Sequence, residues 1–157
     1  MRLVLYEPDI PQNAGTMMRL AACLGVALEL VEPAGFLLSD RHLRRAGMDY
    51  LDRLALTRHS SFAAFGRWRE NLRPRPRLLL LTTKGEESYH AFAFRPDDLL
   101  MVGRESAGVP EAVHREADAR LRIPLAAGLR SLNVATAAAM VLGEALRQTG
   151  LFPGGEG

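Results

Sequence analysis

Three glycine-containing turns follow apolar runs in the sequence, and their polar residues could hold a ligand. TTKGEES follows Leu81, RESAGVP follows Gly103, and LAAGLRSLN follows Pro124. Ligands of open parallel sheets bind beyond the carboxyl ends of the strands. If the three runs are parallel strands, we expect the turns to meet and to offer backbone N–H and C=O groups to one ligand.

Glu105 has the most informative position in these turns, because it follows an apolar run and a glycine directly. Its carboxylate can accept backbone hydrogen bonds and simply hold the turn. Alternatively, it contacts a ligand or fixes the loops of a site. The sequence leaves both interpretations open.

The segment NAGTMMRLAACLG near the N-terminus carries a second group of polar residues. Asn13 can cap a helix, and Gly15 would let another group approach the backbone closely. Arg19 lies among Met, Leu, Ala and Cys, so it either extends its charge to solvent or works at a boundary. Taken alone, this segment indicates no particular chemistry.

Several familiar motifs are missing from the sequence. There is no G-x-G-x-x-G and no G-x-x-x-x-G-K-[ST], and Arg104 stands where a nucleophile elbow before Ser106 needs glycine. These absences argue against dehydrogenases, kinase-type enzymes and hydrolases. The four histidines and single cysteine show no metal-ligand spacing, so we expect no metal. Cys23, within RLAACLG, is predicted to be a buried structural thiol.

Strand-like and helix-like segments alternate along the chain. The apolar patterns predict strands at 2–6, 27–31, 54–57, 77–82, 98–103 and 119–125. They predict helices at 13–24, 40–47, 60–71 and 110–117, and a long helix that starts at Ser131. Continuous apolar strands separated by helices indicate an α/β fold whose parallel sheet has helices on both faces. We expect one domain over residues 1–157, with 150–157 as a flexible tail.

Composition adds limits on location and partners. The chain has 157 residues and a net charge of +2, and Lys84 is the sole lysine beside many arginines. Arginine suits phosphate contacts, so a nucleic-acid partner is compatible with this bias. The longest apolar run is too short to cross a membrane. The N-terminus reaches Glu7 and Pro8 too soon for a signal peptide, so we expect a cytoplasmic protein.

With NAGTMMR, LLMVGRESAGVP and RIPLAAGLRSLNVATAAAM in this order, the chain resembles the SPOUT superfamily in its SpoU-type branch. These are RNA methyltransferases that use S-adenosylmethionine. The segments VLYEPDIPQNAG, EPAGF, RRAGMDY and LTTKG are similar to the minimal enzymes that 2′-O-methylate the wobble nucleotide, a cytidine or modified uridine, of certain leucine tRNAs. The resemblance implies a deep C-terminal trefoil knot, a homodimer and S-adenosylhomocysteine as the product.

The resemblance also implies roles for individual residues. The cofactor pocket would be formed by Leu81, Thr82, Gly103, Glu105, Ile123, Pro124, Ser131 and Leu132. The catalytic set would be Asn13, Arg19, Ser131 and Asn133, with no metal. Arg19 would be the activator, although arginine is a poor base because it stays protonated. The acceptor of the 2′-hydroxyl proton is left open.

The final helix carries two apolar faces that bear on the expected dimer. One consists of Leu132, Ala135, Ala139, Leu142 and Leu146, and the other of Val134, Ala138, Val141 and Ala145. Burial against the sheet and a partner subunit explains the pattern, but a buried helix of a monomer explains it too. Gly143 departs from the aromatic residue that relatives often carry, which leaves the detailed dimer contacts open.

Substrate specificity rests on the resemblance, so alternatives stay open. The tRNA would be held by basic residues such as Arg44, Arg45, Arg58, Lys84 and Arg130. One rival is a 2′-O-methyltransferase of another tRNA position or of ribosomal RNA. A rival from another class is a non-catalytic RNA-binding protein, which would not need Asn13, Arg19, Ser131 and Asn133 together.

Overall fold

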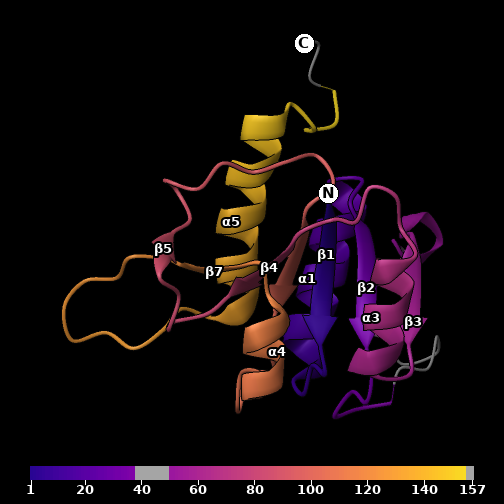
Figure 1. The fold of residues 1–157 in the computed structure, drawn as a ribbon, viewed down its shortest axis with the longest axis horizontal. Helices are drawn as coiled ribbons and strands as arrows, with labels where there is room; N and C mark the ends of the chain where they lie inside the picture. Colours follow the sequence, from indigo (N-terminus) through magenta and orange to yellow (C-terminus); the bar gives the residue numbers. More distant parts are fainter. Residues whose placement is uncertain (38–49, 155–157) are drawn as a thin grey trace.

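The computed structural model describes residues 1–37 and 50–154, and it contains a seven-stranded parallel sheet (Figure 1). The strand order across the sheet is β3-β2-β1-β6-β4-β7-β5, and every pairing is parallel. The strands are β1 (Arg2–Tyr6), β2 (Ala27–Val31), β3 (Leu56–His59), β4 (Leu78–Leu81), β5 (Glu87–Ser88), β6 (Leu99–Val102) and β7 (Ala119–Arg122). The predicted α/β class with a parallel sheet is therefore confirmed.

Helices cover both faces of the sheet, as the sequence predicts. Their bounds are α1 (Pro11–Cys23), α3 (Phe62–Glu70), α4 (Glu111–Glu116) and α5 (Val134–Thr149), with a short 3₁₀ helix η1 (Leu51–Arg53). Side chains of α1 and α5 pack in one core with Leu3 and Leu5, whereas α3 and α4 pack in another with Val4 and Tyr6. This alternation along β1 follows from the two-residue period of a strand.

Some predicted element limits differ from the structure. β3 begins two residues later than predicted, and β5, a strand of two residues, was not predicted. α5 begins at Val134 rather than at Ser131, because Asn133 is its N-cap residue. The predicted helix at 40–47 lies outside the described residues.

The prediction that Cys23 is buried is wrong, because its thiol is exposed. The buried stripe of α1 consists of Ala14, Met17, Met18 and Ala21. Cys23 follows Ala21 by two positions, which turns it about 200° around the helix, away from that stripe. The apolar character of the neighbouring residues therefore gives no information about the face on which the thiol lies.

The chain after β4 passes tightly over β7. Thr82 N–H donates to Leu121 O at 2.9 Å, and Glu86 N–H donates to Arg120 O at 3.1 Å. A Cβ atom on Gly85 would lie 2.4 Å from the carbonyl carbon of Leu121. Only glycine allows this approach of two backbones.

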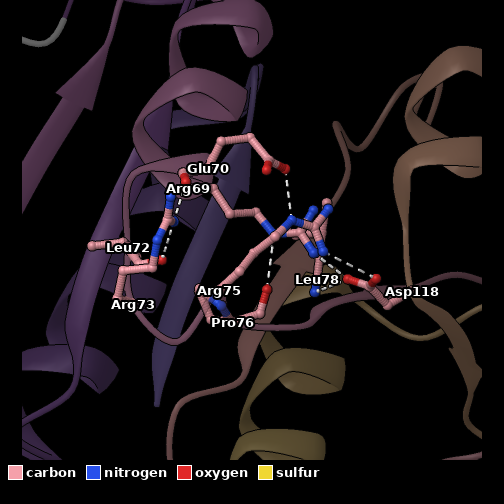
Figure 2. A network of polar contacts seen from close by, with 8 residues as sticks. All are labelled: Arg69, Glu70, Leu72, Arg73, Arg75, Pro76, Leu78 and Asp118. Atoms are coloured by element: carbon pink, nitrogen blue, oxygen red, sulfur yellow. Dashed lines mark hydrogen bonds and ion pairs between the residues drawn. The ribbon is translucent and has the colours of Figure 1, made fainter.

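An ion-pair network joins α3 to the amino ends of β4 and β7 (Figure 2). Arg69, which is 3% exposed, donates from Nε to Pro76 O at 2.9 Å and forms an ion pair with Asp118. Asp118 also accepts from Leu78 N–H at 2.7 Å, and Arg75 approaches its other oxygen at 3.4 Å. Because this network lies at the amino edge of the sheet, it serves the fold rather than a site at the carboxyl edge.

Candidate active site

A cavity of about 840 Å³ opens at the carboxyl ends of β4, β6 and β7, beside the start of α5. This is the size range of cofactor and ligand sites. The three glycine-containing turns meet here, as expected from their places after parallel strands. Ten residues assigned to the site line the cavity, namely Asn13, Leu81, Thr82, Gly103, Glu105, Ile123, Pro124, Ser131, Leu132 and Asn133. Arg19 is the one assigned residue that does not.

The turn after β6 folds back on Gly103. Arg104 N–H donates to Gly108 O at 3.1 Å, and Gly108 N–H donates to Arg104 O at 2.8 Å. A Cβ on Gly103 would lie 2.8 Å from the carbonyl carbon of Gly108 and 2.9 Å from Val109 Cγ1. Glycine at position 103 therefore lets the turn close into the cavity wall.

Asn133 joins the start of α5 to α1. Its Oδ1 accepts from Ala135 N–H at 2.9 Å and from Thr136 N–H at 3.2 Å, and its Nδ2 donates to Asn13 Oδ1 at 2.9 Å. The N-cap residue of α5 is thus Asn133, two residues after the predicted helix start at Ser131. Capping by Asn13 is wrong, because α1 already begins at Pro11, a residue suited to the first turn.

Replacing Asn133 with Ala will lower the free energy of unfolding by about 1 kcal/mol, because α5 loses its N-cap. We also expect the Asn13 side chain to lose its fixed orientation, because its Oδ1 loses the 2.9 Å hydrogen bond from Asn133. Asn133→Ser is the matched control, since a serine oxygen caps well but cannot bridge to Asn13. Urea denaturation of both variants measures the first effect, and the side-chain amide resonances of Asn13 in NMR spectra measure the second. Equal stability of the Ala variant and the wild type would contradict the capping role.

Glu105 and Asp9 hold the β6 and β1 loops together. Asp9 N–H donates to Glu105 Oε2 at 3.2 Å, and Glu105 N–H donates to Asp9 Oδ1 at 3.0 Å. Asp9 Oδ2 also accepts from Ser106 N–H at 3.4 Å and from the Ser106 hydroxyl. Sequence reasoning missed Asp9, because its partner lies 96 residues away and no local pattern links them.

The two carboxyl groups have opposite pKa shifts. A hydrogen bond with the Glu105 carboxyl group, together with those from Ser106 and the backbone, lowers the pKa of Asp9 to about 2. Burial, together with the adjacent Asp9 carboxylate, raises the pKa of Glu105 above its ordinary value. The Oε1 atom of Glu105 is buried and has no hydrogen-bond partner within the protein. Asp9 therefore stays ionised while Glu105 holds a proton more readily than a free glutamate.

Arg19 contacts Tyr50 and does not line the cavity. Its guanidinium lies 4.7 Å from the centre of the Tyr50 ring, and its NH2 group donates to the Tyr50 hydroxyl at 3.1 Å. Arg19 is exposed, so it neither packs in the core nor lines the cavity of its own chain. The structure therefore separates Arg19 from Asn13, Ser131 and Asn133.

Positive side chains surround the cavity. Arg104, Arg122 and Arg130 line it, and Arg104 forms an ion pair with Glu7. Of the predicted RNA contacts, Lys84 is exposed and Arg58 forms an ion pair with Glu32, whereas Arg44 and Arg45 lie outside the described residues. Within residues 1–37 and 50–154, no group of three or more His, Cys, Asp or Glu side chains could hold a metal. In the same part of the chain, no helix is long and apolar enough to cross a membrane.

Comparison with known proteins identifies the family. The family model described as the SpoU rRNA methylase family matches residues 1–143 of this chain. The chain belongs to the SpoU rRNA methylase family. It is therefore a methyltransferase, and the predicted SpoU-type membership is confirmed.

Two curated relatives of this SpoU protein have the same name. A tRNA (cytidine(34)-2′-O)-methyltransferase of Beijerinckia indica is 66% identical over 94% of this chain and 91% of its own length. The tRNA (cytidine(34)-2′-O)-methyltransferase of Escherichia coli K12 is 42% identical over 98% of this chain and 96% of its own length. The similarity therefore extends over nearly the full length of both relatives.

Solved structures of SpoU methyltransferases have the same fold. A structure described as giving insights into the 2-OH methylation of C/U34 on tRNA has a TM-score of 0.85 and 46% identity, covering 94% of each chain. The SpoU methyltransferase AviRb of Streptomyces viridochromogenes, solved with AdoMet, has a TM-score of 0.85 and 29% identity, covering 94% of this chain and 60% of AviRb. AviRb thus contains a comparable domain within a longer chain.

Proposed function

We propose that this SpoU protein methylates the ribose 2′-hydroxyl of wobble nucleotide 34, a cytidine or modified uridine, in leucine tRNAs. The observation that carries the proposal is the cavity, where Asn13, Ser131 and Asn133 meet the three strand-end turns. The names of the relatives support nucleotide 34. The leucine tRNAs and the modified uridine rest on the resemblance of the N-terminal segments.

S-adenosylmethionine fits the residues of the cavity. The apolar side chains of Leu81, Ile123 and Leu132 line the cavity and would contact the adenine ring. The other members of the proposed binding set are Thr82, Gly103, Glu105, Pro124 and Ser131. The unpartnered Glu105 Oε1 is a polar atom for which the protein alone provides no partner. When bound, the cofactor supplies an electrophilic sulfonium methyl group, so the protein mainly has to position the ribose.

The polar residues of the cavity would hold the ribose hydroxyl. Asn13 and Asn133 fix one another through their 2.9 Å hydrogen bond, and Ser131 lies two residues before Asn133 in the same cavity wall. No metal is required for this displacement. Arg19 is proposed to act on the RNA, where its permanent charge suits a phosphate.

A homodimer would bring a second surface to the site. In the single chain, α5 buries residues of both predicted faces, whereas Ala139 of the first face and the neighbouring Met140 remain exposed. The buried residues are Ala135, Leu142 and Leu146 of one face and Ala138, Val141 and Ala145 of the other. Further large apolar side chains are exposed at Leu132, Leu151 and Phe152. A second subunit that covers these side chains would also bring Arg19 to the cavity of the partner subunit. Arg19 does not line the cavity of its own chain.

We further propose that residues 1–157 form one SPOUT domain with a C-terminal trefoil knot. The tight passage of residues 82–86 over β7, and the place of β7 between β4 and β5, support this topology. The tRNA would be held by this domain and its dimer mate in the cytoplasm.

The decisive experiment uses labelled S-adenosylmethionine and total tRNA from a strain that lacks the endogenous activity. We expect label on the ribose of nucleotide 34 of leucine tRNAs, found by nucleoside mapping. Ribosomal RNA from the same strain is the matched control substrate. Label on a base, or on ribosomal RNA alone, would refute the proposal.

A further inference from the structure

Glu105 is the only carboxylate among the described residues that line the cavity. The other polar side chains there belong to Asn, Ser, Thr and Arg, and no His, Lys, Cys or Tyr is among them. Amides and hydroxyls do not accept a proton at neutral pH, and a guanidinium is already protonated. Among the described residues of the cavity wall, Glu105 is therefore the side chain that can accept a proton at neutral pH.

The proposed methyl transfer requires such an acceptor, because the ribose 2′-hydroxyl loses its proton when its oxygen is methylated. We infer that Glu105 accepts this proton, directly or through one water molecule, and that Asp9 positions Glu105 for the task. The inference rests on the proposed function, since it assumes a ribose hydroxyl in the cavity. It extends that function by naming the acceptor and a residue that serves it.

Geometry supports the assignment. Glu105 Oε2 is held by Asp9 N–H at 3.2 Å, so the orientation of the carboxyl group is fixed. Its Oε1 has no hydrogen-bond partner within the protein, and the nearby Asn13 amide lowers the pKa of Glu105 by less than burial and Asp9 raise it. Asn13 is itself bonded to Asn133, so Glu105 lies beside the pair that would hold the ribose.

Asp9 makes Glu105 a better base. The Asp9 carboxylate accepts hydrogen bonds from Glu105 N–H, from Ser106 N–H and from the Ser106 hydroxyl, so it remains charged. That charge and the burial of Glu105 both raise the pKa of Glu105. Once protonated, the Glu105 carboxyl group can donate to Asp9. The charged groups of the other walls are Arg104, paired with Glu7, and Arg122 and Arg130.

The step balances in atoms and charge. The O2′–H bond breaks, and its proton joins the Glu105 carboxylate. The freed electron pair of O2′ bonds the methyl carbon, while the electrons of the old carbon–sulfur bond stay on sulfur as a thioether. One positive and one negative charge disappear together, which a partly buried site favours. The proton then leaves Glu105 for solvent.

Glu105→Gln tests the acceptor, because Gln keeps the size and the oxygen that accepts from Asp9 N–H. We expect the single-turnover rate of methyl transfer to fall about 10²- to 10⁴-fold. Affinities for S-adenosylmethionine and S-adenosylhomocysteine, measured by calorimetry, should fall no more than about tenfold, which is about 1.4 kcal/mol, because Gln still offers a polar atom to the cofactor. Glu111→Gln, an exposed carboxylate on α4, is the matched control and should retain the wild-type rate.

The pH profile separates chemistry from structure. The wild-type rate should rise with pH through the raised pKa of Glu105 and then level off. Asp9→Asn removes the charge that raises this pKa, so the midpoint should move to lower pH. If the contact between Asp9 and Glu105 only stabilises the loops, Asp9→Asn should lower the rate at every pH and leave the midpoint of the pH profile unchanged.

Three results would overturn the inference: a wild-type rate in Glu105→Gln, loss of cofactor binding in that variant, or an unmoved midpoint in Asp9→Asn. Mapping the methylated nucleotide in the same reactions keeps the two proposals apart. Methylation of a ribose other than that of nucleotide 34 would refute the proposed substrate and leave the test of Glu105 intact. If Glu105→Gln methylates the ribose of nucleotide 34 at the wild-type rate, the role of Glu105 is refuted and the proposed substrate stands.

Discussion

Replacing Asp118 with Ala will lower the free energy of unfolding by about 2 to 3 kcal/mol. Arg69 is 3% exposed, and Asp118 is its ion-pair partner (Figure 2). Removing one member of a buried pair leaves an uncompensated charge and typically costs about 3 to 5 kcal/mol. The Asp118 side chain is 32% exposed, so water reduces that cost. The variant also takes an acceptor from Leu78 N–H.

Urea denaturation followed by circular dichroism measures this loss. Glu70→Ala is the matched control, because Glu70 pairs with Arg75 at the surface, where such pairs contribute less than about 1 kcal/mol. The double variant Arg69→Met with Asp118→Ala should recover much of the stability, since it removes the buried charge itself. If Asp118→Ala is as stable as Glu70→Ala, the network does not stabilise the fold.

The Asp118 carboxylate also makes the stability difference between the wild type and Asp118→Ala depend on pH. Burial alone would raise the pKa of Asp118, but Leu78 N–H and the guanidinium groups of Arg69 and Arg75 outweigh it, so the pKa is lowered. A lowered pKa in the folded state contributes stability above the pKa of the unfolded chain, about 3.9 for Asp, and loses it as the pH falls below that value. The difference between wild type and Asp118→Ala should therefore shrink in acid.

The sequence predicts the sheet better than the limits of its elements. β4 and β6 lie within the apolar runs that predict them, because burial on both faces requires continuous apolar residues. β5 escapes prediction, because two residues carry no period. The start of α5 is misplaced because Ser131 and Asn133 both suit an N-cap position, and no local pattern decides between them.

The site is only partly predictable for a similar reason. Parallel strands bring their carboxyl ends together, so the meeting of the three turns follows from strand order along the chain. The assignment of individual residues came from the resemblance. Asp9 and Tyr50 were missed, because each contacts its partner, Glu105 or Arg19, across a distant part of the chain. Such pairings are set by how the loops pack, which local patterns do not encode.

Replacing Arg19 with Ala will abolish measurable methyl transfer, a loss of about 10³-fold or more. Affinity for S-adenosylmethionine should stay nearly unchanged, because Arg19 is exposed and does not line the cavity of its own chain. Single-turnover rates and calorimetric cofactor binding measure the two quantities separately. Arg67→Ala, an exposed arginine on α3 at the opposite face of the sheet, is the matched control and should retain activity.

Two further variants of this pair define what Arg19 does. Tyr50→Phe keeps the ring under the guanidinium but removes the 3.1 Å hydrogen bond, so we expect a smaller loss than in Arg19→Ala. Arg19→Lys keeps the charge but loses the planar fork that binds phosphate through two hydrogen bonds. Activity restored by Lys would show that charge alone suffices, and an inactive Lys variant would require the bidentate contact. Loss of cofactor binding in Arg19→Ala would contradict both, since it would place Arg19 at the cofactor instead of the RNA.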